Sequence, residues 1–437
     1  MTALAGTRTT TLIATLASCY RDAGYVVIGT APTARAAREL RSTACVLAGT
    51  MHALLAELDR GGGFPDRSVL VIDEAGMAPT RITTGIFAHA ARVGTKIIAV
   101  GDPGQPASVQ AGGWLAALAD RHPGPQLREV IRQRDPGERE ALEALHGGRP
   151  ATYLEHKKDA ITVRADEAQA VDALIEQWHA ARHEHGPDGV VMLARDNNTR
   201  ETLNHAGRAR LKEDGALPQR RVFVGHREYA SGDRVITRRN DLLADIDNGT
   251  LATVLAIDDR RHQMVIQTAA GAQRVLDLAY VARHVEYAYA LTGHGAQGAT
   301  AIWVGVVGRP EEFTREWAYT ALSRARDRTT LRVIGPASSS VRERAHNTPS
   351  EEQRIYDRVL YNLCRAMNRS EAEPPAVLRE LQTPLTHDAE GQPRGPHRPA
   401  DTQPGRRTPF DAALSLEPSG PQWRPVSRPR RGPRGGL

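Results

Sequence analysis

Cysteine and aromatic residues are scarce in this chain of 437 residues. Its three cysteines, Cys19, Cys45 and Cys364, lie far apart and form no CxxC pair, which excludes a disulfide framework and a zinc knuckle. No apolar run approaches the roughly 18 residues that a membrane span needs. The N-terminus has neither the charged start nor the small-residue cleavage site of a signal peptide. We therefore expect a cytoplasmic protein with no membrane partner.

The residues that are present allow a globular fold of two or three domains. Apolar residues make up 40% of the chain, enough for real cores at this length. The net charge of +6 mildly favours a polyanionic partner. Much of that excess lies from about residue 369 onward, where proline, arginine and glycine dominate. We expect residues 369–437 to be disordered and residues 341–368 to form a helical extension.

The segment Val69–Met77, VLVIDEAGM, predicts a strand buried on both faces that ends in two acids. Ligands of open α/β sheets bind at the carboxyl ends of the strands, and adjacent carboxylates there suit phosphoryl chemistry. Asp73 is placed to hold Mg²⁺, and Glu74 to orient or deprotonate an attacking water. The alternative is a strand that ends in solvated acids.

A second apolar run, Lys96–Val100, ends in a polar loop that contains Gln105. Because parallel strands bring their carboxyl-end loops together, we expect Gln105 and Glu74 to reach the same phosphate. Arg132 follows in the stretch LREVIRQ, where the alternative is a solvated helix face.

The first forty residues predict a loop, a helix, a strand and a second helix, the pattern of a doubly wound sheet. The loop includes Gly6, Thr7, Arg8, Thr9 and Thr10. A phosphate-binding loop reads GxxxxGK[ST], whose glycines let backbone N–H groups face the phosphates and whose lysine reaches the terminal ones. This chain lacks that lysine and the second glycine, and its only cation is arginine. The sequence is consistent with a degraded phosphate loop or with a polar turn at a helix start.

The second half of the chain predicts another α/β unit with a β-rich insertion. A run from Gly189 to Ala194 starts the second sheet, and short strand-like runs separated by Gly and Asp turns occupy residues 221–280. We expect lobe 1 at 1–150, lobe 2 at 151–215 and 281–340, and a small β-barrel at 216–280. His183 and His185 flank Glu184, but no third metal ligand is nearby, so a solvated loop is expected there.

Taken in order, eight stretches resemble superfamily one helicases, in the branch that holds RecD-like helicases and the helicase half of MobF conjugative relaxases of the TraA type. The stretches are APTARAAREL, TMHALL, VLVIDEAGM, VGDPGQ, LREVIRQRDP, GDRVITRRND with DNGT, YALTGHGAQGAT and YTALSRARDRT. They span about residues 3 to 335. Each stretch alone is a weak signal, and their shared order is a strong one.

This resemblance implies two RecA-like parallel-sheet lobes with an SH3-like β-barrel insertion. It further implies ATP and Mg²⁺ in the cleft, single-stranded DNA across the top, and movement in the 5′ to 3′ direction. By matching motif, Asp73 is the Mg²⁺ partner, Glu74 the general base and Gln105 the γ-phosphate sensor, while Arg132 and Arg324 are arginine fingers. Such fixed cations would stabilise charge on the transferred phosphoryl group.

The same matching implies a DNA-facing set. Its members are Thr33, His52, Thr292, His294 and Gln297. Motors of this kind hold strands mainly by their phosphates, so little sequence preference is expected. Conjugation or repair proteins are the expected partners.

The phosphate loop departs from the family pattern. The family reads like AGTGKTTTL, and this chain reads AGTRTTTL. Aligned from the right, Arg8 takes the lysine place and Thr9 the Mg²⁺ place, whereas aligned from the left Thr9 replaces the lysine. Arginine is bulkier than lysine, and the shorter loop should cradle phosphate less well. A non-catalytic single-stranded DNA-binding remnant and a RecD-like repair helicase therefore stay open as alternatives to a conjugation-linked helicase.

Overall fold

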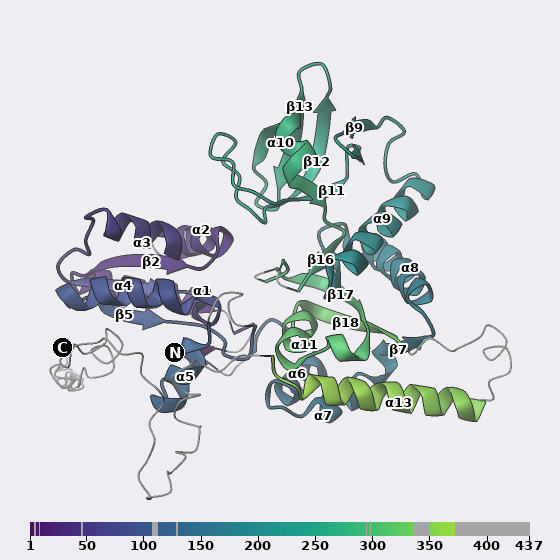
Figure 1. Cartoon of the computed structure of the whole chain (residues 1–437), viewed down its shortest axis with the longest axis horizontal. Coiled ribbons are helices and arrows are strands. Elements are labelled where there is room, and N and C mark those ends of the chain that lie inside the picture. Colours follow the sequence, from purple (N-terminus) through teal and green to yellow (C-terminus); the bar gives the residue numbers. More distant parts are fainter. Residues whose placement is uncertain are drawn as a thin grey trace, which may run out of the picture.

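The computed structural model describes residues 1–3, 6–7, 9–44, 47–106, 112–127, 130–293, 295–297, 299–335 and 349–371. Two of the predicted site residues, Arg8 and His294, lie outside the described residues, as do residues 372–437 of the predicted disordered tail. Figure 1 shows three bodies, which are a first α/β lobe, a second α/β lobe and a β-rich insertion above the second lobe.

The first lobe is built on a parallel sheet in the order β3-β2-β4-β5. These strands are β2 (Val26–Ala31), β3 (Leu47–Thr50), β4 (Ser68–Ile72) and β5 (Lys96–Ala99). The two-residue strand β1 (Thr2–Ala3) bridges to Gly101 just after β5 and pairs in parallel with β6 (Gln126–Leu127). The loop that resembles a phosphate loop therefore follows a very short strand beside β5.

Helices cover both faces of this sheet. They are α1 (Thr9–Asp22), α2 (Ala34–Thr43), α3 (Met51–Asp59), α4 (Thr80–Val93) and α5 (Trp114–Arg121). Strand β4 is buried at every position, and its side chains alternate between the two faces. Val69 and Val71 pack with α1 and α2, whereas Leu70 and Ile72 pack with α3, α4 and α5. The strand that carries the acids is thus the apolar centre of the lobe.

The second lobe has a five-stranded parallel sheet in the order β16-β8-β17-β18-β7. Its strands are β7 (Ile161–Arg164), β8 (Val190–Ala194), β16 (Ala290–Thr292), β17 (Ala301–Gly308) and β18 (Ala325–Ile334). Its helices are α6 (Pro136–His146), α7 (Pro150–His156), α8 (Glu167–His185), α9 (Asn197–Glu213), α11 (Arg315–Leu322) and α13 (Pro349–Met367). Two α/β lobes with parallel sheets agree with the expected fold class.

Helix α6 packs into the core of the second lobe, although it precedes residue 150. Ala141, Leu142 and Leu145 share one buried cluster with strands β8, β17 and β18. A division of the chain by its cores therefore falls near Asp135, which caps α6. We propose this boundary in place of residue 150.

The insertion contains a five-stranded antiparallel sheet in the order β14-β13-β12-β11-β15, with a separate β9-β10 hairpin. Its elements are β9 (Val222–Val224), β10 (Arg227–Tyr229), β11 (Arg234–Thr237), β12 (Leu251–Asp258), β13 (Gln263–Thr268), β14 (Gln273–Asp277), α10 (Leu278–His284) and β15 (Val285–Tyr287). The predicted β-rich insertion is present, and its closure into an SH3-like barrel stays a prediction.

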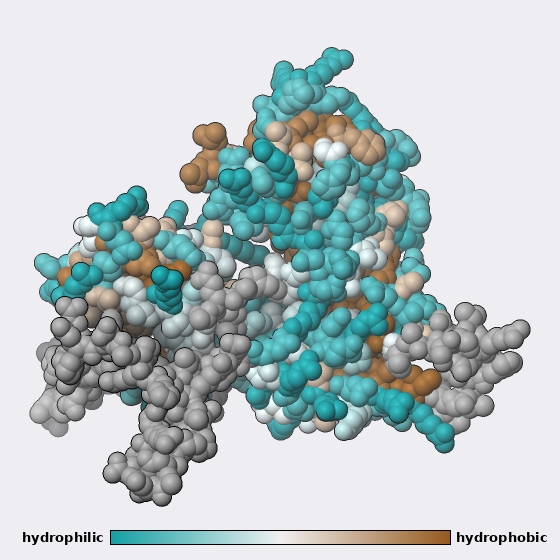
Figure 2. Space-filling view, in the orientation of Figure 1, coloured by the Kyte–Doolittle hydropathy of each residue, from teal (hydrophilic) through white to brown (hydrophobic). Residues whose placement is uncertain are grey.

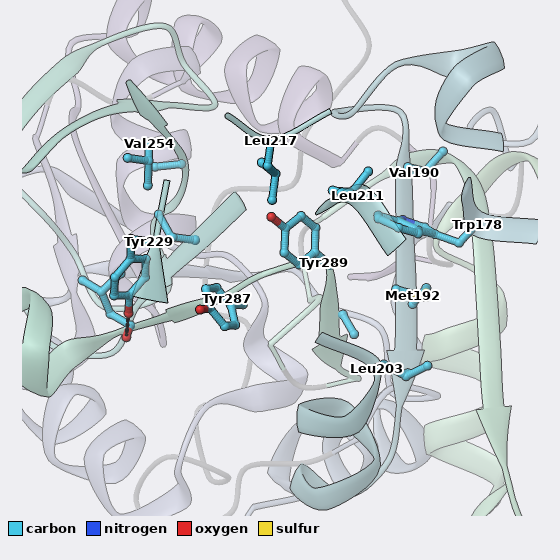
Figure 3. Packing of buried hydrophobic residues seen from close by; sticks show 14 of the residues in the cluster. Trp178, Val190, Met192, Leu203, Leu211, Leu217, Tyr229, Val254, Tyr287 and Tyr289 are labelled. Carbon is cyan, nitrogen blue, oxygen red and sulfur yellow. Dashed lines mark hydrogen bonds between the residues drawn. The ribbon is translucent and has the colours of Figure 1, made fainter. Parts of the chain in front are cut away.

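The insertion and the second lobe share one hydrophobic core, which Figure 3 shows from close by. A row of aromatic rings crosses the junction, with centroid distances of 5.7 Å between Trp178 and Tyr289, 6.3 Å between Tyr289 and Tyr287, and 5.5 Å between Tyr287 and Tyr229. Asp233, which is fully buried, accepts hydrogen bonds from Arg208 of α9 and from the Tyr289 hydroxyl. The insertion is therefore joined to the second lobe by packing and by buried polar bonds.

Figure 2 shows a largely hydrophilic surface on the side it presents, with separate apolar areas. Within the part of the chain that the structure describes, no helix has both the length and the apolar character needed to span a membrane.

Helix α13 closes the second lobe, and its buried face makes a test of the fold. Leu363 is fully buried among lobe 2 side chains, whereas Tyr361 on the same helix is exposed. We expect Leu363→Ala to lower the free energy of unfolding by about 2–5 kcal/mol, because it removes buried methyl groups and leaves a cavity. Tyr361→Ala is the matched control, with a change within about 0.5 kcal/mol. Urea unfolding followed by circular dichroism measures both, and equal effects would contradict the docking of α13.

Candidate functional site

Two acids follow β4 at its carboxyl end, as the sequence predicts. The Asp73 backbone N–H donates to Thr30 O at 3.0 Å, and the Glu74 N–H donates to Asp73 Oδ1 at 2.9 Å. Glu74 adopts a left-handed backbone conformation with φ of 50°, which is uncommon for a residue other than glycine. Such strained residues are often found at functional sites.

Both acids are largely shielded from water, which changes their proton affinity. Burial, followed by the charge of Glu74, raises the pKa of Asp73 to about 7. Burial also raises the pKa of Glu74, while the charges of Arg324 and Arg132 act in the opposite direction. Neither acid is fully exposed, which favours a site over the alternative of two solvated acids.

The two predicted arginine fingers come from different parts of the chain, and both lie close enough to act on the charge of Glu74. Arg132 donates from Nη1 to Ser323 O at 3.0 Å, and Arg324 donates from Nε to Thr320 O at 2.8 Å. Burial, followed by the charge of Arg132, lowers the pKa of Arg324 to about 9, so the guanidinium remains charged at neutral pH. The charges of both arginines act on Glu74, although within the described residues no ion pair joins either of them to it.

The segment that carries Arg132 is not a helix, and Arg132 itself is not fully exposed. Residues 130–134 are irregular, and the Arg132 side chain is partly buried. The Ile131 and Arg132 N–H groups both donate to Gly6 O at 3.0 Å. Gly6 has a φ of +91°, and a Cβ atom at this position would lie 2.7 Å from Arg132 Cβ. Glycine is therefore required here for the loop to lie so close to the segment 130–134, which carries Arg132.

One cavity of about 890 Å³ joins the acids to most of the other predicted residues. Predicted residues in its lining are Gly6, Thr7, Thr9, Thr10, Thr33, His52, Asp73, Glu74, Arg132, Thr292 and Gln297. The insertion contributes Ile236, Arg238, Asn240, Asn248 and Gly249 to the same lining. All three bodies therefore face a single space.

The predicted DNA-facing residues have identifiable local positions. Thr33 caps the N-terminus of α2, where its hydroxyl accepts from Ala36 N at 3.2 Å. His52 lies in the first turn of α3, and Thr292 ends β16. The Gln297 side-chain amide has no hydrogen-bond partner in the described structure, although both polar atoms are buried. An unpartnered buried amide beside a cavity fits a polar ligand.

Among the predicted residues that the structure describes, Gln105 and Arg324 are absent from the cavity lining. The Gln105 side chain instead hydrogen-bonds Asp102, which is buried just after β5. Burial raises the pKa of Asp102, whereas His146 and three hydrogen bonds, among them those from Gly104 and Tyr319, act in the opposite direction. Gln105 therefore lies next to the acids through Asp102 rather than beside Glu74 in the cavity.

Sequence reasoning missed Asp102 and Gln133. Asp102 had a signal, since it closely follows an apolar strand, as Asp73 does, although β5 is only partly buried. Gln133 had none, yet its buried Nε2 donates to Ser323 O at 3.2 Å and to Ala325 O at 2.8 Å. Its contacts hold the Arg132 segment against the end of α11, so they connect the two lobes beside the acids.

A second connection crosses from the first lobe to the insertion. Arg38 of α2 donates to Asp247 Oδ2 at 2.6 Å and lies 3.7 Å from Asp245 Oδ1. Both aspartates belong to the loop between β11 and β12, and Asn248 and Gly249 of that loop line the cavity. The Arg38 side chain is 46% exposed, so this contact contributes about 0–1 kcal/mol.

Comparisons with known proteins agree on one group. A family model described as an AAA domain matches residues 1–168. Conjugal transfer protein TraA of Rhizobium radiobacter is 27% identical over 330 residues, which cover 74% of this chain and 30% of the relative. The ATP-dependent RecD2 DNA helicase of Deinococcus radiodurans is 30% identical over 336 residues, which cover 74% of this chain and 45% of the relative. The chain thus spans about a third to a half of the length of these relatives.

Solved structures show the same fold. The crystal structure of Pif1 helicase from Bacteroides in complex with ADP-AlF3 and ssDNA has a TM-score of 0.50 at 17% identity. The match covers 82% of this chain and 92% of that chain. The crystal structure of Pif1 helicase from Candida albicans also gives a TM-score of 0.50 at 17% identity.

The raised pKa of Asp73 implies that the free energy of unfolding depends on pH. The folded-state pKa of about 7 exceeds the ordinary aspartate value of 3.8, so the folded state binds the proton more tightly. The resulting stabilisation is present at low pH and is lost as the pH rises through 7. Asp73→Asn carries no charge, so its stability relative to the parent chain should increase between pH 4 and pH 7 and then level off. A gain on the order of a few kcal/mol is the upper limit, since one pKa unit is about 1.4 kcal/mol.

Urea unfolding without Mg²⁺ at pH 5 and pH 8 measures this difference. Asp66→Asn is the matched control, because Asp66 lies exposed in the loop before β4. A pH-independent difference for Asp73→Asn would contradict the desolvation of this carboxyl group.

Proposed function

The chain belongs to the superfamily of RecD-like and TraA-type helicases, and from this membership we propose that it is an ATP-dependent motor on single-stranded DNA. The observation that carries the proposal is the shared cavity. Its lining includes the acids after β4 and Arg132, which we propose as a finger. It also includes the residues that we propose to face DNA and that the structure describes, namely Thr33, His52, Thr292 and Gln297. A motor needs this arrangement because ATP hydrolysis at the acids must change how tightly the DNA-facing residues bind the DNA strand.

The residues present fit a bound nucleotide with Mg²⁺, apart from the altered loop. Asp73 would hold the metal with Thr9, and Glu74 would accept a proton from the attacking water. Arg132 and Arg324 would face charge developing on the transferred group. The positive charges of Arg132 and Arg324 act on Glu74, but neither arginine forms an ion pair with it. An anionic phosphate group between the two arginines would therefore balance their charge. Bound Mg²⁺ supplies charge neutralisation at the phosphates.

The altered loop supports a second candidate, a DNA-binding remnant without useful ATPase activity. The loop between Gly6 and the start of α1 at Thr9 offers fewer backbone N–H groups than a full phosphate loop. Positioning supplies most of the catalysis in phosphoryl transfer. We therefore propose that the loop, rather than the acids or the fingers, limits turnover.

Rebuilding the loop tests this proposal. Inserting Gly after Thr7 together with Arg8→Lys restores AGTGKTTTL. We expect DNA-stimulated ATPase activity to rise about 100-fold or more, where each tenfold step corresponds to about 1.4 kcal/mol of barrier. The same insertion with Arg8 retained separates loop length from the lysine. Glu74→Gln in the rebuilt chain should abolish the gain.

Two outcomes would overturn parts of the proposal. Brisk ATP hydrolysis by the unmodified chain on single-stranded DNA would show that Arg8 replaces the lysine. No hydrolysis by the rebuilt chain would favour the remnant candidate.

A separate prediction concerns DNA binding. We expect this chain to bind single-stranded DNA with little sequence preference and with affinity that falls steeply with salt. Arg238 lines the cavity from the insertion, so Arg238→Gln should lower the slope of log K against log salt by about 0.7–1. Arg261→Gln, in the exposed turn between β12 and β13, is the matched control. Fluorescence anisotropy at several salt concentrations measures the slopes, and affinity that ignores salt would contradict the interface.

The TraA relatives support a role beside conjugation proteins, and the RecD relatives support the alternative of a repair helicase. Movement in the 5′ to 3′ direction and a cytoplasmic location remain predictions from the resemblance and the sequence.

A further inference from the structure

A cluster of two histidines and one aspartate lies in the second lobe, on residues that are not in the cavity lining. His179 and His183 are four residues apart on α8, so they share one face of that helix. Asp214 caps the C-terminus of α9, which packs beside α8. The sequence analysis had expected a solvated loop at residues 183–185, but these residues form the last turn of α8.

The three side chains converge on one point. His179 Nε2 lies 3.1 Å from Asp214 Oδ2, and His183 Nε2 lies 3.3 Å from the same oxygen. The two imidazole rings are nearly perpendicular, with an interplanar angle of 84°. One ligand atom from each residue lies within 4.8 Å of the other two. Histidines four residues apart on a helix are a common arrangement for holding Zn²⁺.

These separations match the edges of a metal polyhedron. Tetrahedral Zn²⁺ with bonds of about 2.0 Å keeps neighbouring ligand atoms about 3.3 Å apart. Both nitrogen-to-oxygen distances are close to that value. The side chain of His183 is 66% exposed, so it can turn to complete the geometry without moving the core.

The surroundings hold the ligands without filling the site. His179 is buried against the α8–α9 junction, which fixes one ligand firmly. Arg210 lies 3.7 Å from Asp214 Oδ1 and so orients the carboxylate by the oxygen that faces away from the histidines. Arg210 also donates to Glu176 at 3.1 Å, which compensates its charge. The exposed side of the cluster leaves a position for water.

We propose that His179, His183 and Asp214 form a binding site for a first-row transition-metal cation of the Zn²⁺ class, with water as a further ligand. Two imidazoles and one carboxylate suit this class of cation, whereas Mg²⁺ and Ca²⁺ prefer oxygen ligands. The site joins the ends of α8 and α9 just before the chain enters the insertion, where Leu217 packs into the shared core. A bound cation would therefore hold the ends of α8 and α9 together where the insertion begins.

The test uses the full chain after chelator treatment and dialysis. Isothermal titration with ZnCl₂ should show saturable binding of one Zn²⁺ per chain, and Co²⁺ should give the strong visible absorption of a four-coordinate site. His183→Ala and Asp214→Asn should each weaken binding by at least about tenfold. Zn²⁺ should raise the Tm of the parent chain by more than it raises the Tm of His183→Ala at the same concentration.

His185→Ala is the matched control, because His185 belongs to the same helical turn and lies outside the cluster. It should bind Zn²⁺ as the parent chain does. The proposal is overturned if the parent chain shows no saturable binding, or if His183→Ala and Asp214→Asn bind as tightly as the parent. Equal loss in His185→Ala would assign the binding to surface histidines in general and would also overturn it.

Discussion

The desolvation of two adjacent carboxylates is the constraint on which the centre of this molecule depends. Strand β4 is buried at every position, so the chain brings Asp73 and Glu74, both half-buried, to the end of an apolar strand. Without nearby cations, burial makes the charged form of each acid unfavourable. The raised pKa of both groups reflects this desolvation free energy. For Glu74 the compensating charges are Arg132, from the segment 130–134, and Arg324, from the end of α11. Charge balance at the acids is therefore tied to how the two lobes meet.

A chain of hydrogen bonds makes that meeting specific. Gly6 O accepts from the segment 130–134, and Gln133 of the same segment donates to two carbonyl oxygens in the second lobe. A change in the backbone of the loop that contains Gly6 should therefore shift the positions of Arg132 and Ser323. This continuity explains why a glycine with positive φ is needed at position 6, whereas the missing lysine beside it would affect phosphate binding without removing these bonds.

The sequence predicted the parts of the site that local pattern determines. A short apolar run that ends in acids favours a buried strand with its acids at the sheet edge, and Asp73 and Glu74 were identified on that basis. The partner of an amphipathic helix is not encoded in its own pattern, and α6 accordingly packs with the second lobe rather than the first. Gln133 gave no signal, because a single polar residue in an irregular segment is buried only through tertiary contacts. Asp214 likewise approaches His179 and His183 only when α8 and α9 pack together.

The junctions of the insertion differ in strength, and this difference bears on how the bodies can move. On one side, the aromatic row from Trp178 to Tyr229 and the buried Arg208–Asp233 pair join the insertion to the second lobe. Separating them would expose apolar rings and leave a buried charge unpaired, at a cost of about 3–5 kcal/mol for the charge alone. On the other side, the half-exposed contact between Arg38 and Asp247 contributes about 0–1 kcal/mol. Any opening of the cavity should therefore break the contact with α2 first, so that the insertion moves as one body with the second lobe.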